Sequence, residues 1–296
     1  MNPYQKEFRS QTFSSIFTVL SKTFKEIMMG GSLCMVFIVL ALLPLIGILT
    51  TIDWSPFMQM DDIQDSEELA FLMMQSFTDI FANFGVKEAL LFLLSGVSLM
   101  LIGAWYTAFN MLAVEMYIKG HKWSFSELVQ RSLSNSVIWV FMFQLFLILL
   151  YIIVVSLSAI AGGVLQPSMT FLILIGYGLL IMKFIQAQPA IVHGNMSVGQ
   201  AISYSNSKVG VGQTFKYVGI SFLGFISIFM GMMMVMVVGG LLGMIPVLGV
   251  FLSLTLNLIF NFLILALVNI TQSVLYFKYA EDLKSDSSMA IEDHLI

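Results

Sequence analysis

Polar side chains recur inside the last apolar run of the chain, and they are the residues most able to support chemistry. Ser253, Asn257 and Asn261 are spaced four residues apart, and Asn269 and Gln272 continue near the same helical face. Such a stripe is expected to face other helices, because polar groups are costly in lipid. It predicts either a hydrophilic path for a solute or interhelical hydrogen bonds worth roughly 0.6–2 kcal/mol each. The structural role is favoured.

Four further polar residues lie within the apolar runs nearer the N-terminus. Asn110 and Gln144 are candidate hydrogen-bond partners of the polar stripe. Glu115 and Lys183 fall towards the cytoplasmic ends of their predicted spans, where they either pair or extend to the interface. A proton-coupled transporter would need an acid nearer the middle of the membrane than Glu115, so this residue does not by itself predict one.

Searches for catalytic and cofactor motifs find none. The three histidines, His121, His193 and His294, lack metal-ligand spacing, and Cys34 is the only cysteine. The sequence has no phosphate-binding glycine loop, dinucleotide fingerprint or nucleophile elbow, and no basic patch for nucleic acid. We therefore predict no catalytic residues, no metal, no cofactor and no nucleic-acid partner.

Composition identifies the elements that hold these residues. The 296 residues are 58% hydrophobic and only 10% charged, against about 45–50% apolar and about 25% charged in a typical soluble domain. A soluble protein could not cover so much apolar surface, whereas lipid solvates it. We predict an all-α integral membrane protein with a single membrane domain, 1–296.

Apolar segments of about 20 residues or more are long enough to cross the hydrocarbon core as helices. The sequence contains six predicted transmembrane helices, at 30–52, 88–117, 137–164, 169–192, 217–244 and 247–276. Glycine and proline interrupt the chain tightly between the third and fourth spans and between the fifth and sixth. The spans are therefore expected to form three hairpins.

Short amphipathic segments precede these hairpins. Ser124 and Ser197 are good N-cap residues, and Glu127 and Gln200 follow three positions later as a capping box requires. The segment 12–27 has the same plan with a weaker cap. Three interfacial elbow helices, each followed by a transmembrane hairpin, indicate a threefold internal repeat.

The distribution of charge predicts the orientation. Lysine and arginine gather before the first span, after the second and fourth, and in the tail, 277–296, whereas acids crowd the insertion 53–87. The positive-inside rule then places both termini in the cytoplasm. The insertion should carry its own amphipathic helix on the outer side. Its acids favour a solvated helix start over a cation site, because their spacing matches no standard loop.

Two segments resemble a known group of membrane proteins. They are Gln188-Pro189-Ala190-Ile191-Val192, leading into the Ser197 elbow, and the ending that runs from Val274 to Tyr279. Both are similar to a bacterial and archaeal superfamily of six-span proteins. It includes the YciC-like proteins and the membrane domain fused to some glycerophosphodiester phosphodiesterases. The hydrolase barrel of those fusions is absent here. The resemblance implies a bacterial cytoplasmic (inner) membrane protein without transferable catalytic residues.

These observations favour a non-enzymatic scaffold or accessory subunit of a membrane complex. Its interfacial helices would bind the lipid bilayer and protein partners. The alternative is a transporter or channel for a small solute or lipid, using the polar stripe of the sixth span. An intramembrane lipid-modifying enzyme is a third hypothesis, and it would need a catalytic constellation that the sequence does not display.

Overall fold

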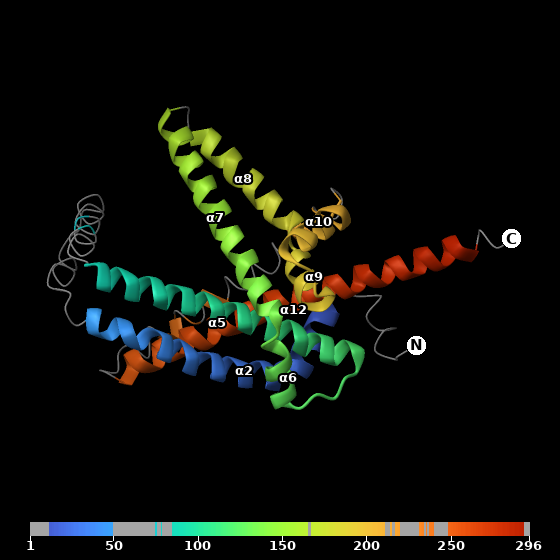
Figure 1. Cartoon of the computed structure of the whole chain (residues 1–296), viewed down its shortest axis with the longest axis horizontal. Helices are drawn as coiled ribbons and strands as arrows, with labels where there is room; N and C mark the ends of the chain where they lie inside the picture. Colours follow the sequence, from blue (N-terminus) through green and yellow to red (C-terminus); the bar gives the residue numbers. More distant parts are fainter. Residues whose placement is uncertain are drawn as a thin grey trace. The chain divides into compact units, whose positions relative to one another are not determined.

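The fold is taken from a computed structural model, in which the described residues form α-helices joined by turns (Figure 1). None of these residues lies in a strand. The structure describes residues 12–49, 75, 78, 85–164, 167–210, 214, 217–219, 231–233, 235, 237–239 and 248–292. The helices are α2 (Thr12–Leu49), α5 (Val86–Lys119), α6 (Phe125–Ser132), α7 (Asn135–Val164), α8 (Pro167–Lys183), α9 (Ala187–Gly194), α10 (Val198–Lys208) and α12 (Leu248–Glu292).

Length and composition make several of these helices compatible with membrane spans. Within the described residues there are five such segments: Ile16–Leu45, Val86–Lys119, Asn135–Ala159, Ile175–Gly194 and Thr255–Lys278. This agrees with a multi-pass membrane protein. The predicted fifth span, 217–244, falls mostly outside the described residues, as does the insertion 53–87 with its acidic helix.

Contacts divide the chain into two compact units. One comprises Leu33–Gly103, and the other comprises Met1–Ser32 together with Ala104–Ile296. Helices α2 and α5 each contribute residues to both units. The candidate functional residues described below belong to the larger unit.

One core cluster of the larger unit is formed by α2, α5 and α12. Apolar side chains recur along α12 every four residues, so they line one helical face and are buried against the other two helices. The cluster consists of Ile16, Val19, Ile27, Val114, Ala266, Ile270 and Val274. These contacts fix the relative positions of the helices that carry the polar residues.

The first predicted elbow, 12–27, is not separate from the first span. Helix α2 continues without a break through both, and the elbow residues Ile16, Val19 and Ile27 are buried in the core. Gly30 follows the elbow without interrupting the helix. Its backbone packs directly on the ring of Phe109, leaving no room for a side chain. The apolar face of this segment is divided: Ile16 and Ile27 are buried against protein, whereas Phe17 and Phe24 are exposed.

The fourth predicted span, 169–192, is not one continuous helix. It ends as α8 at Lys183 and restarts as α9 at Ala187 after a turn. Pro189 accounts for the break, because its ring excludes the carbonyl four residues earlier and it lacks an N–H donor. In the first turn of α9 neither property is costly. Hydropathy does not register this break, since apolar residues continue through it.

The predicted hairpin of the third and fourth spans is present. Helices α7 and α8 pack against each other, and Pro167 begins the second of them (Figure 1). The fifth predicted span comes close to α12 at Gly231, because a Cβ atom there would lie 2.8 Å from Cε2 of Phe260. Helix α12 itself extends to Glu292, through much of the predicted tail.

Candidate functional site

Helix α6 is the elbow whose capping was predicted at Ser124 and Glu127, and the capping box is present. The amide of Glu127 donates to Oγ of Ser124 at 3.3 Å, and the amide of Ser124 donates to Oε2 of Glu127 at 2.7 Å. The amide and the hydroxyl of Ser124 both donate to the Glu127 carboxylate and hold its pKa below its ordinary value of 4.5. At the other end of α6, Nε1 of Trp105 donates to Oγ of Ser132 at 2.8 Å. Helix α6 is thereby fixed to α5.

Helix α10 is the second elbow, and it is fixed to the break between α8 and α9. At its start the amide of Ser197 donates to Oε1 of Gln200 at 3.0 Å. Within α10, Oγ of Ser205 donates to the carbonyl of Lys183 at 2.5 Å and accepts from the amide of Gln186 at 3.2 Å. One hydroxyl therefore bonds backbone groups on both sides of the break, where the helical ladder is interrupted.

A cluster of ionisable and hydroxyl groups joins α5, α9 and α12. The carboxylate of Glu115 accepts from Nζ of Lys119 at 2.5 Å, and its other oxygen lies 2.9 Å from Nδ1 of His193. The remaining nitrogen of His193 lies 3.1 Å from Oγ of Ser273. An ionised carboxylate can only accept, so Nδ1 carries a hydrogen; in the neutral ring Nε2 then accepts from Ser273, and in the protonated ring it donates to Ser273.

The order of atoms in this cluster is that of an acid, a base and a nucleophile. Glu115 orients His193, and His193 lies within hydrogen-bond reach of the Ser273 hydroxyl. However, Ser273 is 0% exposed and does not line the adjacent cavity. A nucleophile must reach the atom it attacks, so the cluster is better explained as a set of hydrogen bonds that holds α5, α9 and α12 together.

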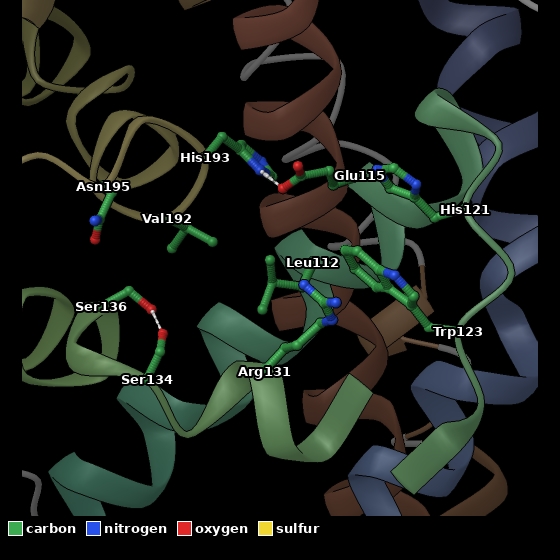
Figure 2. Close-up of a pocket in the computed structure, with 10 residues that line it drawn as sticks. All are labelled: Leu112, Glu115, His121, Trp123, Arg131, Ser134, Ser136, Val192, His193 and Asn195. Atoms are coloured by element: carbon green, nitrogen blue, oxygen red, sulfur yellow. Dashed lines mark hydrogen bonds and ion pairs between the residues drawn. The ribbon is translucent and has the colours of Figure 1, made fainter. Parts of the chain in front are cut away.

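A cavity of about 610 Å³ adjoins this cluster. Figure 2 shows Arg131 rising from α6 beside Leu112 and Trp123, while Ser134 and Ser136 lie across from it. The walls come from α5, α6, α7, α9 and their connections. The lining residues are Leu112, Glu115, His121, Trp123, Arg131, Ser134, Ser136, Val192, His193 and Asn195.

Aromatic and cationic groups are stacked on one side of the cavity. The ring of His121 lies 4.9 Å from that of Trp123 at an interplanar angle of 13°, and the Arg131 guanidinium lies 4.5 Å from the Trp123 ring. On the other side, the hydroxyls of Ser134 and Ser136 are 2.8 Å apart. The cavity therefore offers hydrogen-bond donors and a fixed cation.

The predicted polar stripe is not uniform along α12. Asn257 and Asn261 are exposed, and the side chain of Asn261 donates to the carbonyl of Asn257 at 2.9 Å. Asn269 is 1% exposed and Gln272 is half-buried. The side chain of Ser253 lies outside the described residues. The C-terminal half of the stripe is thus directed into the protein.

The other predicted polar residues have different surroundings. Asn110 is completely buried, and its amide atoms have no hydrogen-bond partner among the described residues. Gln144 is half-buried. Glu115 pairs with Lys119 and His193, while Lys183 contributes its backbone carbonyl to the α8–α9 break.

Sequence reasoning missed the roles of His193, Ser273 and Arg131. The local spacing around His193 does not indicate its two partners, which are 78 and 80 residues away in the chain. Its position directly after the apolar Pro189–Val192 segment is the signal that could have indicated burial. Among the described residues, no group of three or more His, Cys, Asp or Glu side chains could hold a metal ion.

The chain has no match among protein-family models, curated proteins or solved structures.

Proposed function

We propose that this chain is a non-enzymatic scaffold or accessory subunit of a complex in the bacterial cytoplasmic membrane. The observation that carries the proposal is the attachment of two short elbow helices to the spanning helices. Trp105 anchors α6 through Ser132, and Ser205 anchors α10 to the α8–α9 break. Elbows held in this way offer fixed polar faces to lipid headgroups and protein partners.

The proposal retains the predicted organisation of six spans in a threefold repeat. Helix α6 precedes the α7–α8 hairpin, and α10 precedes the fifth and sixth spans. In the first of the three predicted repeats, the elbow and its span form one continuous helix, α2. The positive-inside rule puts the elbows and both termini on the cytoplasmic side. The resemblance to the YciC-like superfamily fits this arrangement.

A transporter or channel for a small solute or lipid is the second candidate. Asn110 on α5 is fully buried without a partner among the described residues, and Nδ2 of Asn269 on α12 is in the same condition. Buried amides left without hydrogen bonds cost about 1–3 kcal/mol each. Water or a solute passing between the helices would satisfy them.

Native mass spectrometry of the full chain, extracted gently from its own membrane, tests the first candidate against the second. A stoichiometric protein partner is the expected result. A lone chain that carries a small solute, and moves it in liposomes, would overturn the scaffold proposal. In that case Asn257→Leu with Asn261→Leu should abolish transport and leave thermal stability nearly intact, because both residues are exposed and, among the described residues, the Asn261 side chain donates to the Asn257 carbonyl of its own helix.

A further inference from the structure

Arg131 is a fixed cation at the cavity between α5, α6, α7 and α9. Among the residues that the structure describes, its guanidinium has no carboxylate partner within salt-bridge distance. The nearest acid along its helix, Glu127, accepts hydrogen bonds from the amide and hydroxyl of Ser124, and the charge of Arg131 contributes a smaller part to lowering its pKa. Stacking on Trp123 holds the guanidinium plane and leaves its N–H edge available for hydrogen bonds.

Neutral donors face the same space. Ser136 is 4% exposed, and its hydroxyl is held beside that of Ser134, just where α7 begins. Asn195 adds a side-chain amide from the end of α9, where its backbone is left-handed, with φ of 51°. A guanidinium together with hydroxyls and an amide matches the several acceptor oxygens of a phosphate group. The N-terminus of α7 adds further positive potential.

One acid also lines this cavity, and its charge is compensated. Glu115 accepts from Lys119 through one oxygen and contacts His193 through the other. Both carboxylate oxygens of Glu115 are therefore paired, one with Lys119 at the end of α5 and the other with His193 on α9. Arg131 is therefore a cation of this cavity without an ion-pair partner within salt-bridge distance among the described residues.

We infer that this cavity binds a phosphate group, with Arg131 as the principal ligand and Ser134, Ser136 and Asn195 as supporting donors. The inference rests on the proposed function for the source of that group, which is the headgroup of a membrane phospholipid. A volume of about 610 Å³ is ample for such a headgroup, since it lies within the range of ligand pockets, about 300–1,000 Å³.

The test uses the detergent-solubilised full chain and two probes, water-soluble dihexanoyl phosphatidic acid and inorganic phosphate, with binding measured by calorimetry. Arg131→Gln should weaken binding of the lipid probe at least tenfold. Lys122→Gln removes the same charge from a nearby exposed position that does not line the cavity, and it should change binding less than twofold. Ser134→Ala with Ser136→Ala should weaken binding without removing a charge.

The two probes separate the sources of phosphate. Binding of the lipid probe alone supports a headgroup site, and equal Arg131-dependent binding of inorganic phosphate supports the same site with a soluble ligand. No binding of either probe, or equal losses in Arg131→Gln and Lys122→Gln, would overturn the inference. A scaffold without a phosphate site would still retain its protein partner in native mass spectrometry, so the two proposals fail independently.

Discussion

Polar residues inside the apolar runs can be recognised from the sequence by their polarity alone. Glu115, Asn110 and Asn269 were recognised as intramembrane polar groups, and all three are buried. Their partners were not predictable. The contacts of His193 with Glu115 and Ser273 join three helices that are distant in the chain, and no spacing rule connects residues that far apart.

The close approach of α2 to α5 at Gly30 depends on glycine having a hydrogen atom where other residues have a Cβ atom. An added Cβ would overlap the Phe109 ring, whose Cδ1 would lie 2.8 Å away. Phe109 is 0% exposed and has little room to move. Gly30→Ala should therefore lower stability by about 1–3 kcal/mol through overpacking. The loss, measured as a lower midpoint of thermal unfolding in detergent, should outweigh the helix-propensity gain of about 1 kcal/mol.

Gly31 supplies the matched control for this substitution. A Cβ there would meet Tyr106 Oη at 3.4 Å and Phe262 Cγ at 3.9 Å, which are ordinary contacts. Gly31→Ala has the same propensity gain without the overlap, so its midpoint should stay unchanged or rise. Equal effects at the two positions would show that the ring adjusts freely.

Helices with local signals were predicted well, and helices shaped by tertiary contacts were not. The capping boxes of α6 and α10 depend on residues three positions apart, so sequence alone suffices to find them. The continuity of α2 and the break before α9 depend on packing and on one proline inside an apolar run. Hydropathy averages over both features.

The capping residue of α6 is titratable and that of α10 is not, and this difference predicts a selective response to acid. Glu127 caps α6, and its pKa is lower in the folded protein than its ordinary 4.5. Its stabilising contribution is present above the unfolded value and lost as pH falls through the folded value. Gln200 caps α10 and does not titrate.

Lowering the pH from 6 to 3 should therefore loosen α6 and leave α10 unchanged. Amide hydrogen exchange, corrected for its intrinsic pH dependence, measures this in the two helices of the same sample. Glu127→Gln should make hydrogen exchange in α6 as insensitive to this fall in pH as exchange in α10. Parallel loosening of both elbows in the native chain would contradict the assignment.

At the scale of the whole molecule, composition alone predicted a helical membrane protein, and the five apolar helices found among the described residues agree with it. Sequence also supplied the number of spans and their orientation as predictions. The compactness of the two units depends on long-range contacts, which hydropathy and charge counts do not encode.

Orientation is testable by labelling single cysteines in a Cys34→Ser background. The predicted topology has the α5–α6 connection in the cytoplasm and the α7–α8 turn outside. Gln166→Cys should react with a membrane-impermeant maleimide in intact cells, whereas Lys122→Cys should react only after permeabilisation. The reverse pattern would place the elbows outside and invert the positive-inside assignment.

The hydroxyl that completes the turn between α8 and α9 comes from Ser205, which leaves the ribosome after the turn itself. Lys183 and Gln186 are synthesised 22 and 19 residues earlier. Until α10 emerges, their backbone groups lack this partner and need water or the insertion machinery to bond them. The fourth segment therefore reaches its final bent form only after the following elbow has been made. Ribosome-bound chains that end before Ser205 should hold this segment in a different conformation.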